Sequence, residues 1–279
     1  MSTSTADIGA RLMQPLANWP LQARRSLVGV FTDIDDTLTT EGAITPDALE
    51  AMAALKAAGL HLVAVTGRPV GWSMPFAAAW PIDAIVAENG AVALVPTRDG
   101  RLEKRYQQDA PTRERNFARM QAVLERIEKA IPGARRATDS GGRECDIAID
   151  HSEFTHLSDD TIADVASVMR SEGMHATVSS IHVNGWYGDH NKLAGARWIV
   201  RELWDRRLDD EMDRWAYVGD STNDALMFEH FAHSIGVANV RRFENALSHL
   251  PRYVSTHERG AGFAEAAAAV LAAKRLDAR

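Results

Sequence analysis

The chain has 279 residues, 46% of them hydrophobic, which is enough to bury the core of one large domain or of two ordinary ones. A formal net charge of −7 provides no overall positive field that would attract nucleic acid. No apolar run approaches membrane-spanning length, the first 26 residues lack a secretory signal, and the single Cys145 allows no internal disulfide. We therefore expect a soluble, globular, cytoplasmic protein.

The first 25 residues begin with a polar stretch and offer no recognisable chemistry. Apolar side chains then recur at Leu12, Met13, Leu16, Trp19 and Leu21. We expect a loose end followed by a segment that packs on the body of the protein.

An apolar run at residues 28–32 ends in three carboxylates within four positions: Asp33, Asp35 and Asp36. Such a run fits a strand buried on both faces of a parallel sheet, and these strands present ligand-binding groups at their carboxyl ends. Two carboxylates two residues apart repel each other unless a positive charge lies between them, which favours Mg²⁺. A polar turn with N-cap aspartates is the alternative. A calcium-binding EF-hand is excluded because its glycine and glutamate are missing.

Next comes a helix predicted between residues 45 and 59, and then a second apolar strand at residues 60–65 that ends in the polar turn Thr66-Gly67-Arg68. A strand–helix–strand unit makes its two strands parallel and places both polar ends at one edge. Thr66 is therefore expected near Asp33. A short strand at residues 84–87, followed by Glu88-Asn89-Gly90 and a hairpin, completes this part.

From about residue 105 the pattern changes, and we expect an inserted domain. A helix around residues 117–131 precedes two strands on either side of Gly141-Gly142. A second helix around residues 162–173 precedes two more short strands before residue 185. The order αββαββ predicts an antiparallel sheet with helices on one face.

After the insertion, helical spacing returns at Lys192, and an apolar strand at residues 215–218 ends in Gly219-Asp220. Asn223 and Asp224 follow within a turn that opens the next helix. A short strand at residues 234–237 and an alanine-rich helix at residues 262–274 close the chain.

Four polar motifs now stand in a fixed order: Asp33-Ile34-Asp35, Thr66-Gly67-Arg68, Lys192, and Gly219-Asp220 with Asn223-Asp224. They resemble the four motifs of the haloacid dehalogenase superfamily over residues 26–105 and 189–260. The insertion resembles the type IIB cap of its sugar phosphatases, the group of the Cof-type, sucrose-phosphatase and mannosyl-3-phosphoglycerate phosphatase proteins. The resemblance implies an α/β fold with a Rossmann-like parallel-sheet core, residues 1–104 and 189–279, and an inserted α+β cap, residues 105–188.

The resemblance also implies roles for individual residues. Asp33 would be the nucleophile, and Asp35 would protonate the leaving oxygen and later activate water. The phosphate-binding residues would be Thr66, Gly67, Arg68 and Lys192, and the Mg²⁺ ligands would be drawn from Asp33, Asp35, Asp220, Asn223 and Asp224. One departure is Asp36, where the family usually has glycine. Aspartate tolerates the left-handed turn that glycine provides, but its role is unexplained.

Simpler interpretations exist for several of these residues. Lys192 alone fits a solvated helix start, Thr66 alone fits an N-cap, and Arg68 alone fits a surface ion pair. In the insertion, polar and aromatic side chains suited to sugar hydroxyls and ring faces are Arg143, Asp150, His182, Asn184 and Trp186. Solvated strand faces and core aromatics also explain such residues.

We interpret the sequence as an Mg²⁺-dependent phosphomonoester hydrolase that acts on a small phosphorylated metabolite, foremost a sugar phosphate, through an Asp33 aspartyl-phosphate. A sugar phosphomutase or phosphotransferase on the same core is one alternative, and a non-catalytic metal- or ligand-binding module is another. The expected partner is a small phosphorylated substrate, with neither nucleic acid nor membrane. Neither the substrate's identity nor the oligomeric state follows from the sequence.

Overall fold

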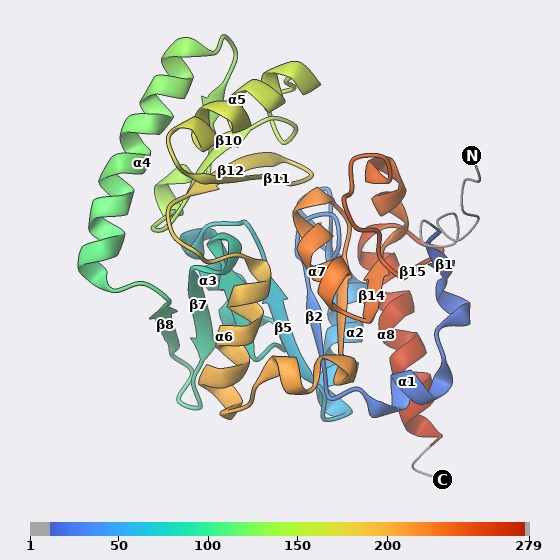
Figure 1. Ribbon diagram of the computed structural model, residues 1–279. Coiled ribbons are helices and arrows are strands. Elements are labelled where there is room, and N and C mark those ends of the chain that lie inside the picture. Colours follow the sequence, from blue (N-terminus) through green and yellow to red (C-terminus); the bar gives the residue numbers. More distant parts are fainter. Residues whose placement is uncertain (1–11, 277–279) are drawn as a thin grey trace, which may run out of the picture.

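A computed structural model describes residues 12–276, and its main element is a nine-stranded sheet in the order β1-β15-β14-β13-β2-β5-β6-β7-β8 (Figure 1). The first seven strands in this order run parallel, and β7 and β8 add an antiparallel hairpin at one edge. The strands are β1 (Gln14–Pro15), β15 (Tyr253–Val254), β14 (His233–Gly236), β13 (Trp215–Gly219), β2 (Gly29–Thr32), β5 (His61–Val65), β6 (Ala84–Ala87), β7 (Val92–Pro96) and β8 (Leu102–Tyr106). The predicted parallel-sheet core is confirmed.

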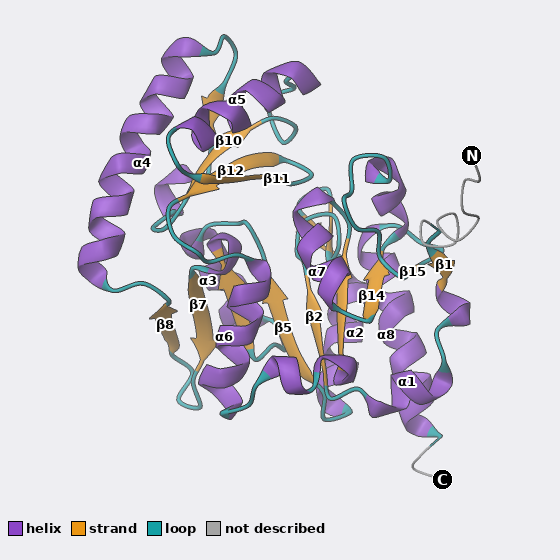
Figure 2. Cartoon of the chain, viewed as in Figure 1, coloured by secondary structure: helices purple, strands orange, loops and turns teal. Residues whose placement is uncertain are grey.

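Helices cover both faces of this sheet, as Figure 2 shows. On one face lie α2 (Pro46–Ala57), α3 (Val70–Ala79) and α8 (Arg259–Arg275), with α1 (Leu21–Ser26) beside α8; on the other lie α6 (Lys192–Trp204) and α7 (Ala225–His230). Neighbouring strand residues point to opposite faces, so Val30 packs in the first layer and Phe31 in the second. Strands buried on both faces therefore appear in the sequence as unbroken apolar runs.

The insertion forms a separate layer over the carboxyl ends of the parallel strands (Figure 1). In chain order it contains α4 (Ala110–Ala130), β9 (Arg135–Arg136), β10 (Ile147–Asp150), α5 (Asp159–Ser171), β11 (His175–Val178) and β12 (His182–Trp186). Its four strands form an antiparallel sheet in the order β11-β12-β10-β9, and its helices pack on the face turned away from the core. The predicted αββαββ order is confirmed. We call this layer the cap and keep residues 105–188 as its proposed bounds.

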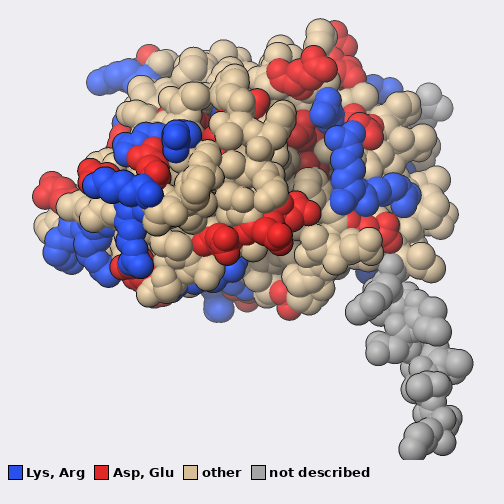
Figure 3. Space-filling view, turned by 90° about the horizontal axis from the view of Figure 1, so that it is seen from above, with Lys and Arg blue, Asp and Glu red and all other residues tan. Residues whose placement is uncertain are grey.

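A two-stranded hairpin, β3 (Thr39–Thr40) with β4 (Ala43–Ile44), follows the loop after β2. No helix among residues 12–276 combines the length and the apolar character that a bilayer crossing requires. On the face seen from above in Figure 3, basic and acidic side chains lie close together, so their fields partly cancel.

The segment before β2 packs on the sheet, as predicted for its later part, while residues 1–11 lie outside the described residues. Met13, Leu16 and Trp19 are buried, whereas Leu12 and Leu21 are exposed. Strand β1 extends the sheet by pairing with β15, which was not predicted because two residues carry no alternation to detect.

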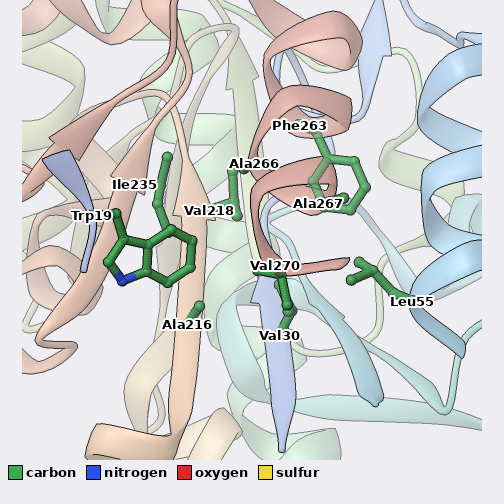
Figure 4. A pocket seen from close by; sticks show the side chains of 10 residues that line it. All are labelled: Trp19, Val30, Leu55, Ala216, Val218, Ile235, Phe263, Ala266, Ala267 and Val270. Carbon is green, nitrogen blue, oxygen red and sulfur yellow. The ribbon is translucent and has the colours of Figure 1, made fainter. Parts of the chain in front are cut away.

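Trp19 is the anchor of this segment. Its side chain is 1% exposed, its Nε1 lies 3.4 Å from His233 Nδ1, and its ring stacks on Tyr253 at 5.8 Å between centroids. Figure 4 shows Trp19 across from Ala266 and Val270 of α8. The void between them has a volume of about 10 Å³. The space would hold about one water molecule, so we interpret it as a packing gap and not as a ligand site.

We predict that Trp19→Ala lowers the free energy of unfolding by about 3–5 kcal/mol, because it removes a large buried side chain whose neighbours collapse only partly. Urea unfolding followed by circular dichroism measures the change. Leu12→Ala is the matched control in the same segment, since Leu12 is 76% exposed, and it should change the free energy by less than about 0.5 kcal/mol. A Trp19→Ala protein as stable as this control would contradict the anchoring role.

Candidate active site

Three adjacent parallel strands, β13, β2 and β5, deliver polar side chains to one edge of the sheet. Asp33 follows β2, Thr66 follows β5 and Asp220 follows β13, while Lys192 is the first residue of α6. The structure thus brings the four sequence motifs together. A pocket at this edge is lined from the core by Asp33, Asp35, Thr66, Gly67, Arg68 and Asn223, and from the cap by Ser179, Ser180, Ile181, His182 and Asn184.

The acidic cluster of Asp33, Asp220 and Asp224 is buried, with carboxylate oxygens within 4.8 Å of one another. Lys192 Nζ lies 2.7 Å from Asp33 Oδ1 and 2.7 Å from Asp224 Oδ1. Burial raises the pKa of Asp33 to about 7, against the opposing charge of Lys192. Burial also raises the pKa of Asp220 well above its usual range, and the charges of Asp33 and Asp224 add to the effect. The cluster is therefore short of positive charge.

A divalent cation fits this deficit. When ionised, the three carboxylates carry three negative charges and Lys192 supplies one positive charge, which leaves two uncompensated. Carboxylate oxygens are the ligands that Mg²⁺ prefers, so the residues present suit the predicted ion. Asp35 and Asn223 also line the pocket, and the Asp35 carboxylate is not part of the three-carboxylate cluster.

Two residues that the sequence did not single out fix this cluster. Tyr217, within β13, donates its hydroxyl to Asp224 Oδ1 over 2.5 Å. Asn239 donates from Nδ2 to Asp220 Oδ2 over 3.1 Å and to the Asp36 carbonyl over 3.0 Å. Tyr217 looks like an ordinary core aromatic in sequence, and Asn239 follows a short strand, so neither position carried a signal for this role.

Asp35 is held by Arg68 in a bidentate ion pair, with Nε and Nη2 at 2.9–3.0 Å from its carboxylate oxygens. The same guanidinium contacts two cap carboxylates, Asp139 at 3.1 Å and Glu153 at 2.8 Å. Burial alone would raise the pKa of Glu153, but hydrogen bonds from His182 and Arg68 lower it to about 2. Arg68 therefore links the loop after β2 to the cap. Asp139 and Glu153 lie in loops far from any motif and were not predicted.

Asp36 adopts the left-handed conformation expected of it, with φ 54°. Its carboxylate lies 3.0 Å from Arg259 Nε at the start of α8. Burial raises the pKa of Asp36, and Arg259 opposes that shift. The Asp36 side chain thus faces α8, and it does not belong to the cluster that Asp33, Asp220 and Asp224 form among the described residues.

The predicted cap residues fall in different places. Asn184 and His182 line the pocket, and His182 Nε2 lies 3.0 Å from Glu153. The Asp150 carboxylate accepts hydrogen bonds from the backbone N–H groups of residues 152–155, so it shapes the loop that carries Glu153.

The other two predicted cap residues do not line the pocket. Trp186 belongs to the cap's hydrophobic core, and its Nε1 donates a hydrogen bond to a backbone carbonyl. Arg143 is buried against Asp139, Asp146 and the Gly67 carbonyl.

The comparisons with known proteins fit this geometry. Residues 30–114 match the family model for haloacid dehalogenase-like hydrolases. No curated protein matches the sequence. Among solved structures, a protein from Thermoplasma acidophilum is 18% identical, with a TM-score of 0.64 over 85% of this chain and 96% of that one.

Two further structures cover nearly the whole chain. The sucrose-phosphatase of Synechocystis, solved with sucrose and phosphate, is 17% identical with a TM-score of 0.62, over 88% of this chain and 98% of that one. The C-terminal domain of trehalose-6-phosphate phosphatase from C. albicans is 12% identical with a TM-score of 0.65, over 93% and 99%. These likenesses establish the fold. The match over residues 30–114 agrees with the resemblance to haloacid dehalogenase-like hydrolases that the four sequence motifs carry.

Proposed function

We propose that the protein is an Mg²⁺-dependent phosphomonoester hydrolase whose substrate is a sugar phosphate. The observation that carries the proposal is the convergence of Asp33, Lys192, Asp220 and Asp224 beside a pocket that also contains Asp35. An anionic phosphate needs positive charge and oriented donors, and a nucleophilic carboxylate needs the same charge to approach it. Lys192 supplies one positive charge at this edge of the sheet, and a bound Mg²⁺ would supply the rest.

Asp33 is the nucleophile in this proposal. Its carboxylate oxygen attacks phosphorus, the bond to the leaving oxygen breaks, and an aspartyl-phosphate forms on Asp33. Asp35, which takes up a proton once Arg68 leaves it for the substrate phosphate, gives this proton to the leaving oxygen. In the second step Asp35 takes a proton from water as the water oxygen attacks phosphorus, which releases phosphate and restores Asp33.

In this scheme the phosphoryl oxygens are bound by the Lys192 ammonium group, the Thr66 hydroxyl and the Gly67 N–H. Asp33, Asp220 and Asp224 would hold Mg²⁺, with Asn223 close by. The ion, when bound, supplies two positive charges that reduce repulsion between the Asp33 carboxylate and the phosphate.

The sugar part of the proposal rests on the cap and on the neighbours. The two cited phosphatases are named for sucrose and for trehalose 6-phosphate. Here the cap presents His182 at the pocket and Glu153 beside it, groups that pair well with hydroxyls. The cavity left between cap and core is only about 10 Å³, so the cap must open before a sugar phosphate can enter.

We predict that Asp33→Asn abolishes phosphate release from a panel of sugar phosphates, because an amide is a far weaker nucleophile than a carboxylate. Phosphate release is measured with wild type, Asp33→Asn and the exposed control Asp47→Asn, whose turnover should equal that of wild type. Circular dichroism confirms that the variants fold. If Asp33→Asn retained turnover, the assignment of Asp33 as the nucleophile would be wrong. Conversion of the substrate to an isomer without free phosphate would identify a mutase instead.

We also predict that Mg²⁺ raises the melting temperature of the wild type and that Asp220→Asn removes most of this shift. A ligand at a hundred times its Kd stabilises the folded state by about 2.7 kcal/mol. Because burial raises the pKa of Asp33 to about 7, a proton on Asp33 competes with the ion. The Kd for Mg²⁺ should therefore increase when the pH falls from 8 to 6. Scanning calorimetry measures the melting temperature, and titration calorimetry measures the Kd. A melting temperature that does not change when Mg²⁺ is added would contradict the proposed site.

A further inference from the structure

A second polar cluster lies at the junction of core and cap, beside the loop Thr66-Gly67-Arg68. Its members are at most 4% exposed, which is unusual for polar and charged side chains. The junction cluster consists of Glu88 and Asn89 from the core and Arg143, Asp146 and Asn184 from the cap. Buried polar groups of this kind are normally hydrogen-bonded, and here their partners lie in both the core and the cap.

Glu88 fixes a cap segment against the core. Its carboxylate accepts the backbone N–H of Val70, the first residue of α3, over 2.9 Å. It also accepts the backbone N–H groups of three consecutive cap residues, Glu144 at 3.0 Å, Asp146 at 3.2 Å and Cys145 between them. The segment just before β10 is therefore tied to the start of α3.

Asp146 then orients two donors of the cap. Its carboxylate lies 2.7 Å from Arg143 Nη1 and 3.1 Å from Asn184 Nδ2. The same two nitrogens donate to the carbonyl oxygen of Gly67, at 3.0 Å from Arg143 and 3.2 Å from Asn184. The cap thus makes two hydrogen bonds to a single backbone carbonyl of the phosphate-binding loop.

The other two carbonyls of that loop are held by the core. Asn89 N–H donates to the Thr66 carbonyl over 2.9 Å, and Glu88 N–H donates to the Arg68 carbonyl over 3.0 Å. Because a trans peptide is planar, the direction of each carbonyl fixes the opposite direction of the following N–H. The Gly67 carbonyl faces the cap, and the next N–H, of Arg68, accordingly donates to Thr66 Oγ1 over 3.0 Å. Only the Gly67 carbonyl depends on the cap.

The fit around Gly67 is close. A Cβ atom at this position would lie 3.3 Å from Asn184 Oδ1 and 3.3 Å from Asn89 Oδ1. Side chains of both cap and core therefore pack closely against the backbone at Gly67.

We propose that Arg143 and Asn184 are positioning residues for the phosphate-binding loop and not substrate contacts. Through the Gly67 carbonyl they fix the peptide plane between Gly67 and Arg68, while the core fixes the plane before Gly67, so closure of the cap completes the loop that binds the phosphoryl group. The inference rests on the proposed function, because it assigns this loop to phosphate. If Arg143 and Asn184 position this loop, the hydrolysis of every phosphomonoester depends on cap closure, whatever its leaving group.

The test is Asn184→Leu, which keeps the size of the side chain and removes the donor. We expect inhibition by inorganic phosphate to weaken, and kcat/KM to fall, by about 10- to 100-fold, the range found when a residue supporting a site is lost. The fall should be equal for sugar phosphates and for p-nitrophenyl phosphate. Arg143→Lys, which keeps the charge but not the planar fork, should show the same pattern more weakly and serves if Asn184→Leu does not fold.

Ser158→Ala is the matched control, since Ser158 is the N-cap of α5 in the cap and does not touch the loop. It destabilises the cap but should leave the inhibition constant for phosphate unchanged. Losses confined to sugar phosphates, with unchanged phosphate inhibition, would make Arg143 and Asn184 substrate contacts and overturn the inference. A wild type without turnover would refute the proposed function, while calorimetry of phosphate binding to both variants would still test the loop.

Discussion

One ammonium group, that of Lys192, faces three buried carboxylates, and the rest of the site depends on this imbalance. Its Nζ neutralises part of the charge on Asp33 and Asp224, while Asp220 is held by the neutral Asn239. Burying uncompensated carboxylates costs several kcal/mol each, so the cluster either keeps protons or takes up a cation. A sheet that ends three parallel strands at one edge makes this arrangement possible, because it brings acids from distant parts of the chain to one place.

Two kinds of contact connect the cap to this edge, and they differ in how readily they break. The junction cluster is buried and ties the cap to the core through backbone groups. Arg68, by contrast, bridges Asp35 to Asp139 and Glu153 across the pocket. Under the proposed function, a substrate phosphate would be an alternative partner for its guanidinium. The substrate would then replace the ion pairs that it breaks, and the cap would open at modest cost.

The sequence was most informative where structure is local. Apolar runs that end in acid predicted β2 and β13 with Asp33 and Asp220 at their ends, and the αββαββ order predicted the cap. Contacts made across the chain were not predictable. Asp139 and Glu153 lie in cap loops with no periodicity, and only the folded chain brings them to Arg68. Asp150 was singled out as a substrate contact because it is a polar residue on a strand, yet its carboxylate binds the backbone of the following loop.

The most direct test of the mechanism is to identify the phosphorylated residue. The wild type is mixed with a sugar phosphate and Mg²⁺, quenched in acid within a turnover, and treated with borohydride, which reduces an aspartyl-phosphate to homoserine. Peptide mass spectrometry then locates the modified residue. Homoserine at position 33, absent without substrate, is the predicted result. Phosphate release with no modification, or modification at another aspartate such as Asp35 or Asp220, would contradict the assignment of Asp33 as the nucleophile.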